Sequence, residues 1–408
     1  MTLYITKCIQ IFLLTYLIVI TVVRSKQIVI RYQYPDRISN RSYGNFVNLA
    51  HQYGYEAEEH IVVTKDYYLL EIFRIDSSPK SPAAKGKPVV LLQHGLMASS
   101  DVWGLFDRSL AYRLADEGYD VWIGNCRGNY YSQSNVLLTP DDPSFWNFTW
   151  HETGTLDLAG TIDYIRGVTR QHTLTVIGHS TGGTALLILL SEKPEYNKIV
   201  NLAITVGSPV IFTKKPIFRS ILSNQLKYAN NIHHPTGSSV KQIHLPSVFF
   251  SNLCQNYNLQ EYCKEFFDIP LNYGFPGMPL EKTQTVYNDP NETSRKFIMH
   301  FFQTLKQPGE FRKYDYKGLN VRHHGQPDAP AYKLNNIVTK LVIFYAKRDL
   351  LCTRTDVEEL ARHVSTNAVI VPISDNNFSH NDFFLHEKVH HLFHNKLLQI
   401  INDELIKR

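Results

Sequence analysis

The sequence carries little charge for its length. Only 19% of its 408 residues are Asp, Glu, Lys or Arg, against roughly 25% in average domains, which excludes a long coiled coil. It has no internal repeat and no low-complexity tract, and 43% of its residues are hydrophobic. That fraction is enough for a sizeable core and excludes a disordered scaffold. The length alone suggests two or three domains at roughly 150 residues each.

Long apolar runs are also scarce. A mean hydropathy of −0.23 with a single such run excludes a multi-span membrane protein. The run, Cys8–Val23, has 16 residues and is followed by Arg24, whereas a membrane-spanning helix needs about 20. These features predict a signal peptide at 1–25, with an uncleaved signal anchor as the alternative. We therefore expect entry into the secretory pathway, with secretion first and lysosomal delivery second, and no membrane span after cleavage.

Neither a strong net charge nor a metal-binding spacing is present. The formal charge of +5 falls to +3 without residues 1–25, which hold two basic and no acidic residues, so a nucleic-acid partner is not expected. The CxxC and HExxH spacings are absent. His390 and His394 lie four residues apart, but no third ligand accompanies them. We expect no metal and no cofactor.

Cysteine is rare, with four residues left after removal of 1–25. Cys254 and Cys263 are nine residues apart in a polar stretch, which suits a local disulfide in an oxidising compartment. Cys126 and Cys352 are expected to be small buried residues without a bridge, and a Cys126–Cys352 disulfide is the alternative. Candidate glycosylation sites, consistent with export, are Asn40, Asn147 and Asn291.

Short apolar runs alternate with helical stretches over much of the chain, which predicts a mostly parallel, doubly wound α/β sheet. An antiparallel pair of strands is expected first, at 60–64 and 69–75. The later strands are expected at 89–93, 120–123, 174–177, 199–206, 341–345 and 368–371. Helices are expected at 105–117, 156–166, 184–190, 356–363 and 387–402.

One pentapeptide in this pattern indicates a catalytic residue. Gly178-His179-Ser180-Thr181-Gly182 fits G-x-S-x-G and lies between an expected strand and an expected helix. A strand-to-helix turn this tight crowds the neighbours of the serine, so glycine is needed on both sides. We therefore expect Ser180 to be a catalytic nucleophile.

A serine nucleophile needs a histidine base and an acid that orients it. In this kind of sheet the chain order is serine, acid, histidine. Asp349 follows the expected strand 341–345, and His380 follows the strand 368–371, so they are our acid and base. Asp356 is the rival acid, but Thr355 and Glu358 around it fit a capping box, which favours a helix start.

An ester-cleaving serine enzyme also needs two backbone N–H groups that bind the oxyanion. We expect them from Thr181, which follows the nucleophile, and from Leu96, in the loop after the strand 89–93. His94 in that loop precedes Ser180 in the chain, so we interpret it as a residue that fixes the loop.

The alternation stops between Gly207 and Lys340. We expect a largely helical cap, or lid, at 208–332, inserted between late strands of a core formed by 26–207 and 333–408. The cap holds two amphipathic helix candidates. The first, 214–228, is expected to pack on the core or to contact a lipid surface. The second, 296–305, is expected to form an apolar wall over Ser180.

Further segments between Tyr53 and Lys396 resemble those of the acid lipase family, which includes gastric and lysosomal acid lipases. The resemblance lies in 53–59, 92–96, 118–122, 124–129, 145–146, 150–152, 157–165, 347–351 and 380–383. It implies an α/β-hydrolase fold, the triad Ser180, Asp349 and His380, and a Cys254–Cys263 disulfide in the cap. It also implies triacylglycerol or sterol ester substrates, often cleaved at acidic pH.

The sequence departs from the family at three places. Thr181 stands where family members usually carry Gln, Ala346 and Lys347 replace the usual glycines before the acid, and the cap segment before Cys254 is shorter. A carboxylesterase for smaller esters and a non-catalytic lipid-binding homologue are therefore alternatives to a serine lipase. We expect a monomer that meets its lipid substrate at an emulsion or membrane interface.

Overall fold

The computed structural model describes residues 44–96, 98–213 and 293–406. Several predictions fall outside these residues and stay predictions: the signal peptide at 1–25, the helix at 214–228, the Cys254–Cys263 disulfide and the glycosylation sites Asn40 and Asn291. None of the helices within the described ranges is long and apolar enough to cross a membrane.

The described residues form a nine-stranded sheet in the order β1-β2-β4-β3-β6-β7-β8-β9, with the short β5 paired to β2. The strands are β1 Glu58–Val63, β2 Tyr68–Ile75, β3 Val89–Gln93, β4 Asp120–Gly124, β5 Ser134–Asn135, β6 Leu174–His179, β7 Val200–Val206, β8 Leu341–Tyr345 and β9 Val369–Pro372. β2 is antiparallel to β1, β4 and β5. All pairs from β4 to β9 are parallel, which confirms the predicted sheet.

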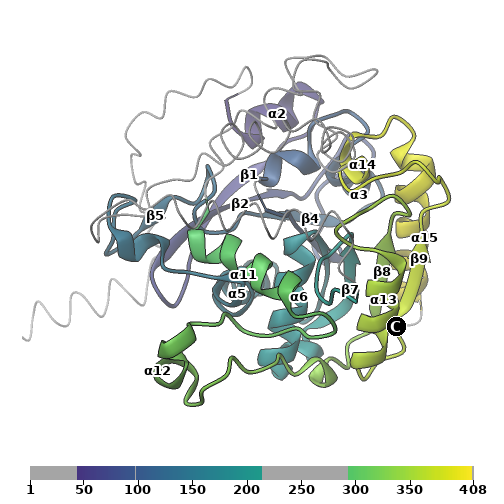
Figure 1. Ribbon diagram of the computed structural model, residues 1–408. Helices are drawn as coiled ribbons and strands as arrows, with labels where there is room; N and C mark the ends of the chain where they lie inside the picture. The colour runs from purple at the N-terminus through teal and green to yellow at the C-terminus, as the bar shows by residue number, and fades with distance from the viewer. Residues whose placement is uncertain (1–43, 97, 214–292, 407–408) are drawn as a thin grey trace, which may run out of the picture. The chain divides into compact units, whose positions relative to one another are not determined.

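Helices cover both faces of this sheet (Figure 1). They are α2 Phe46–Gln52, α3 Leu110–Asp116, α4 Trp150–Glu152, α5 Ala159–Thr169, α6 Thr181–Glu192, α11 Arg295–Lys306, α12 Asn320–His324, α13 Arg354–His363, α14 Asp382–Leu385 and α15 Asn395–Ile406. Two π-helical turns extend this set, Thr153–Leu158 before α5 and His390–His394 before α15.

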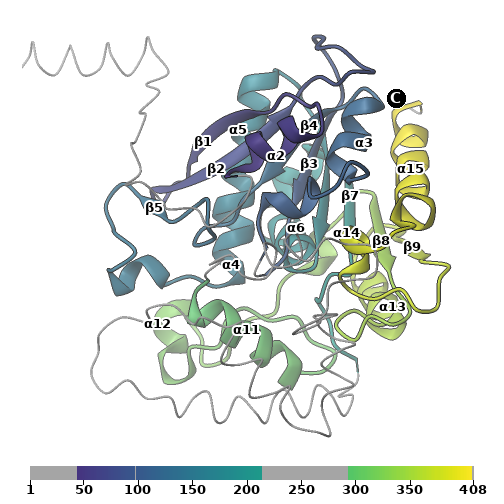
Figure 2. The same cartoon turned by 90° about the horizontal axis from the view of Figure 1, so that it is seen from above.

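The side chains of β3 show how the sheet separates two apolar cores. Leu91 belongs to the core that contains α5, α6, α11 and α13. Its neighbours Val90 and Leu92 belong to the core that contains α2, α3, α14 and α15. Successive strand residues point to opposite faces, so a continuous apolar run such as β3 is buried on both. Figure 2 shows α3 and α15 together on one side of the sheet.

Two helix starts differ from the predictions. The helix expected at 105–117 begins only at Leu110, because Ser109 is extended and its hydroxyl accepts the Phe106 N–H at 2.9 Å, which shapes a turn before the helix. The capping box expected from Thr355 and Glu358 is formed instead by Thr353 and Asp356. The other strands and helices expected within the described ranges are present, with ends shifted by a few residues.

The interval between β7 and β8 is where we expect the cap. Its described part contains α11, which confirms the predicted helix at 296–305, and the short α12. The phenylalanines of α11 are buried in the same apolar core as α6. The division into a cap at 208–332 and a core stays a prediction, since residues 214–292 lie outside the description.

Candidate active site

Ser180 occupies a strained turn between β6 and α6. Its backbone has φ 53° and ψ −128°, a region that non-glycine residues adopt at a cost of about 1–3 kcal/mol. Gly178 and Gly182 make so tight a turn possible, because a side chain at either position would clash with the backbone. A Cβ on Gly178 would lie 2.4 Å from the Gly183 nitrogen, and a Cβ on Gly182 would lie 2.4 Å from the Gln93 carbonyl oxygen. The turn therefore presents the Ser180 side chain at the carboxyl edge of the parallel strands.

The structure brings Ser180, His380 and Asp349 together in one hydrogen-bonded chain. His380 Nε2 lies 3.0 Å from Ser180 Oγ, and His380 Nδ1 lies 2.8 Å from Asp349 Oδ2. A carboxylate only accepts, so Nδ1 carries the proton and Nε2 is free to accept the Ser180 O–H. All three residues are buried: Ser180 is 6% exposed, His380 is 9% exposed and Asp349 is 2% exposed.

The second oxygen of Asp349 is fixed by the backbone. Its Oδ1 accepts the N–H groups of Leu351 at 2.8 Å and Cys352 at 3.1 Å. These bonds hold the carboxylate plane, so Oδ2 is aimed at the imidazole. The rival acid Asp356 accepts instead from Thr213 and Thr353, at the start of α13. Asp382 accepts the Ser379 N–H and thereby supports the loop before His380.

Two further glycines allow the close contacts of this site, and we did not single them out from the sequence. Gly207 directly follows β7 and has φ +57°, and a Cβ there would lie 2.9 Å from Asp349 Oδ2 and 3.3 Å from His380 Nδ1. A Cβ on Gly95 would lie 2.6 Å from Ser180 Cβ. A glycine directly after a strand is the only sequence signal that points to Gly207.

His179 is a third residue whose importance the sequence analysis did not predict. Its Nε2 donates to the His380 carbonyl oxygen at 3.0 Å, and its ring packs on Phe384 with 4.5 Å between centroids. Burial and the neighbouring His380 hold the pKa of His179 well below its usual value. His179 therefore stays neutral and fixes the backbone that carries His380.

His94 has the loop-fixing contacts expected for it. Its Nδ1 donates to the Gly95 carbonyl oxygen at 2.7 Å, and its Nε2 accepts the Cys126 N–H at 3.2 Å. The Asn129 amide also lies 3.1 Å from Nε2. Burial lowers the pKa of His94 to about 4, so the ring is neutral at pH 7. The contacts tie the loop after β3 to the loop after β4.

The two expected oxyanion donors lie on either side of Ser180. Thr181 is the first residue of α6, where a backbone N–H has no partner within its helix. Leu96 follows Gly95, which packs against Ser180. Neither N–H forms a hydrogen bond with any residue in the described ranges. Both groups are therefore available to a bound oxygen atom.

The remaining candidates are two cysteines, one asparagine and a pair of histidines. Cys126 and Cys352 are both free thiols, which excludes the alternative bridge between them. Asn147 is exposed and its side-chain oxygen accepts from Lys296, whereas its glycosylation stays a prediction. His394 is buried on the helical turn before α15. Among the described residues no group of three His, Cys, Asp or Glu side chains is arranged to hold a metal ion.

Comparisons with known proteins show the family to which the chain belongs. Residues 46–106 match the family described as a partial α/β-hydrolase lipase region, and residues 88–261 match the α/β hydrolase fold. Lipase 3 of Drosophila melanogaster is 32% identical, over 81% of this chain and 86% of its own. The chain belongs to the α/β-hydrolase lipases. It is thus a carboxylic ester hydrolase, and the resemblance to acid lipases is confirmed.

Other relatives support the same family. Lipase 1 of Drosophila melanogaster is 31% identical, over 86% of this chain and 78% of its own. Human gastric triacylglycerol lipase is 30% identical, over 77% of this chain and 80% of its own. Among solved structures, an epoxide hydrolase of Vigna radiata is 13% identical and superposes with a TM-score of 0.52, over 85% of this chain and 98% of that one. This last likeness concerns the fold alone.

Proposed function

We propose that the chain is a serine lipase that hydrolyses neutral lipid esters through an acyl-enzyme on Ser180. The observation that carries the proposal is the continuous hydrogen-bond path from Ser180 Oγ through His380 to Asp349, with both outer contacts at 3.0 Å or less. A serine hydroxyl is a weak nucleophile on its own, and a neutral imidazole at this distance activates it.

In the first half of the proposed reaction, Ser180 Oγ attacks the ester carbonyl carbon while its proton moves to His380 Nε2. The imidazolium that forms is stabilised by the Asp349 carboxylate, which stays ionised. The carbonyl oxygen becomes an oxyanion that accepts the N–H groups of Leu96 and Thr181. When the C–O bond breaks, His380 returns the proton to the departing alcohol, and the acyl group remains on Ser180.

In the second half, water attacks the acyl carbon and gives its proton to His380. The tetrahedral intermediate then collapses, Ser180 Oγ leaves and takes the proton back, and the carboxylic acid is released. Thr181 acts here through its backbone, so its replacement of the family's usual Gln leaves the oxyanion donor in place.

The proposed substrates are triacylglycerols, with sterol esters as a second possibility. Relatives of the chain are named triacylglycerol lipases. The segment after Gly207 is apolar and buried, and Phe212 packs edge-on against Phe301 of α11 with 5.8 Å between ring centroids. An apolar surface that begins next to the triad suits an acyl chain. We further propose that residues 208–332 form a lid, that Cys254–Cys263 is its disulfide, and that the protein is secreted after removal of 1–25.

A direct test compares emulsified triolein with soluble short-chain esters between pH 4 and pH 8. We expect hydrolysis of both, and a loss of kcat of roughly 10⁴-fold or more in Ser180→Ala, since the nucleophile is removed. Unchanged activity in Ser180→Ala would refute the mechanism.

The same assay separates the alternatives. A carboxylesterase would hydrolyse the soluble esters and leave triolein intact. A non-catalytic lipid-binding homologue would hydrolyse neither substrate, although the chain would still be folded by circular dichroism.

A further inference from the structure

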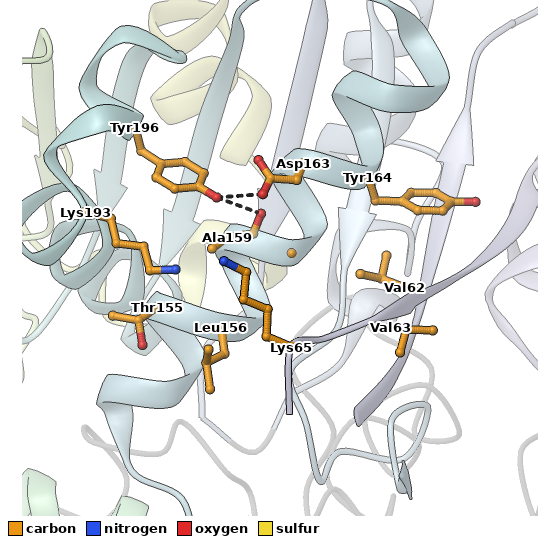
Figure 3. Close-up of a pocket in the computed structure, with 11 residues that line it drawn as sticks. Val62, Val63, Lys65, Thr155, Leu156, Ala159, Asp163, Tyr164, Lys193 and Tyr196 are labelled. Carbon is orange, nitrogen blue, oxygen red and sulfur yellow. Dashed lines mark hydrogen bonds between the residues drawn. The ribbon is translucent and has the colours of Figure 1, made fainter. Parts of the chain in front are cut away.

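A cavity of about 300 Å³ lies at the opposite end of α6 from Ser180 (Figure 3). Its walls come from the end of β1, from the helical run 155–164 and from the segment that follows α6. The 12 residues of α6 separate Ser180 from Lys193, which corresponds to about 18 Å along the helix axis. The cavity is therefore distinct from the proposed active site.

Two lysines face this cavity. The side chains of Lys65 and Lys193 converge in Figure 3, and neither ammonium group forms a hydrogen bond or ion pair with a described residue. The Lys193 ammonium group lies 6.0 Å from the centroid of the Tyr196 ring. Burial, followed by the charge of Lys65, lowers the pKa of Lys193. Two ammonium groups close enough to influence each other repel, and that repulsion is relieved by an anion between them.

The acidic groups nearby are already engaged or lie outside the cavity. Asp163 lines the cavity, accepts the Tyr196 O–H at 2.8 Å and lies 4.0 Å from Arg166. Glu195 is exposed, and its charge and that of Asp163 affect Lys193 less than Lys65 does. Among the residues that line the cavity, two ammonium groups therefore face one carboxylate, which already accepts a hydrogen bond.

Apolar side chains form one part of the remaining wall, and Thr155, Tyr164 and Tyr196 form another. The apolar part consists of Val62, Val63, Leu156 and Ala159, of which Val63 is 56% exposed. A volume of about 300 Å³ is at the small end for ligand sites. The lining therefore suits a small ligand that has one charged end and one apolar end.

We propose that this cavity binds an amphipathic carboxylate, with its carboxylate between the Lys65 and Lys193 ammonium groups and its chain against Val62, Val63 and Leu156. Lysine binds carboxylates as a point charge, so two lysines match the two oxygens of one group. Carboxylic acids with apolar chains are what an ester hydrolase of this family releases from lipid esters. The binding itself does not depend on the chemistry assigned to Ser180.

Lysine footprinting tests the proposal at the site itself. The full chain carrying Ser180→Ala is treated with a limiting amount of acetic anhydride, and acetylation of each lysine is measured by peptide mass spectrometry. Octanoate at ten times its Kd should slow acetylation of Lys65 and Lys193 by about tenfold. Acetylation of the exposed Lys85, outside the cavity, should not change. Octanol and inorganic phosphate should protect none of the three.

Each other outcome counts against the proposal. No protection by octanoate would overturn it. Equal protection by phosphate would mean a general anion site, and equal protection by octanol would mean an apolar site, so either would overturn the carboxylate assignment. Because acetylation is read without turnover, a failure here is distinct from a failure of the proposed lipase mechanism.

A matched pair of variants provides a second measurement on the otherwise unaltered chain. Lys65→Gln combined with Lys193→Gln should abolish octanoate binding at this site while short-ester hydrolysis stays within about twofold, since α6 places the two sites apart. Lys85→Gln should leave both unchanged. Octanoate binding is measured by equilibrium dialysis, and a double variant that binds as many octanoate molecules as tightly as Lys85→Gln would contradict the assignment.

Discussion

At the residue scale, the proposed acid, Asp349, is distinguished by the hydrogen bonds that each of its oxygens accepts. One Asp349 oxygen is held by two backbone N–H groups, and the other by His380. Asp356 accepts hydrogen bonds from Thr213 and from Thr353 at the start of α13. The two aspartates are therefore matched in burial and differ in role.

This contrast predicts opposite outcomes for two identical substitutions. Asp349→Asn should lower kcat by roughly 10⁴-fold with little change in KM, because an amide in place of the carboxylate no longer fixes the proton on Nδ1. Asp356→Asn should lose about 0.5–2 kcal/mol of stability through its cap and keep its ester hydrolysis. Steady-state kinetics and thermal melts of both variants check this. If Asp356→Asn were the inactive one, the assignment of the acid would be reversed.

The residues that sequence alone identified are those with a local signature. Ser180 lies in a pentapeptide, and Asp349 and His380 follow strands in the required chain order. Gly207 and His179 have no such signature, because their importance depends on contacts across the site: a Cβ of Gly207 against Asp349, and the His179 ring beneath the His380 backbone. These distances exist only once the strands are aligned.

At the scale of elements, the β6–α6 turn depends on the absence of side chains. Gly182 lies on the first turn of α6, directly against the backbone of β3 and the loop that follows it. Backbone atoms of a central strand cannot move aside as a flexible side chain can. The turn and the neighbouring strand therefore constrain each other.

A pair of glycine-to-alanine substitutions tests this constraint. In Gly182→Ala the new Cβ would approach the Gln93 carbonyl oxygen to 2.4 Å, so we expect a loss of about 1–3 kcal/mol and of most activity. In Gly167→Ala, on the exposed side of α5, no atom lies within 4 Å of the new Cβ. That variant should gain about 0.5–1 kcal/mol and keep its activity. Urea denaturation measures both, and equal stabilities would contradict the packing described.

Helix starts and irregular turns were the least predictable features of the elements. The apolar pattern at 105–117 is periodic throughout, but the Ser109 hydroxyl captures the Phe106 N–H and delays α3. Likewise the π-helical turn at Thr153–Leu158 joins α4 to α5 in a continuous helical run. The start of α3 and the π-helical turn both depend on individual hydrogen bonds, and the spacing of apolar residues does not predict such bonds.

At the scale of the whole molecule, both apolar cores contain buried histidines that are kept neutral. His300 of α11 donates to the Arg312 carbonyl oxygen at 2.9 Å and stacks on Trp150, and burial lowers its pKa to about 4. Burial, together with the charges of His390 and the nearby arginines, lowers the pKa of His394 to about 3. An unfolded chain would protonate these rings near pH 6.5.

This difference predicts a loss of stability in acid. Between about pH 6.5 and pH 4 the unfolded chain binds protons that the folded chain does not, so the free energy of unfolding falls as the pH falls. We therefore expect Tm to decrease over this range. In His394→Leu the decrease should be smaller, because leucine binds no proton in the unfolded chain. The exposed His172→Leu is the matched control and should leave the profile of Tm against pH unchanged. A Tm that rises towards pH 4 would mean that carboxyl groups with raised pKa values outweigh the histidines. A His394→Leu profile that parallels that of the unaltered protein would mean that His394 contributes nothing to the loss of stability.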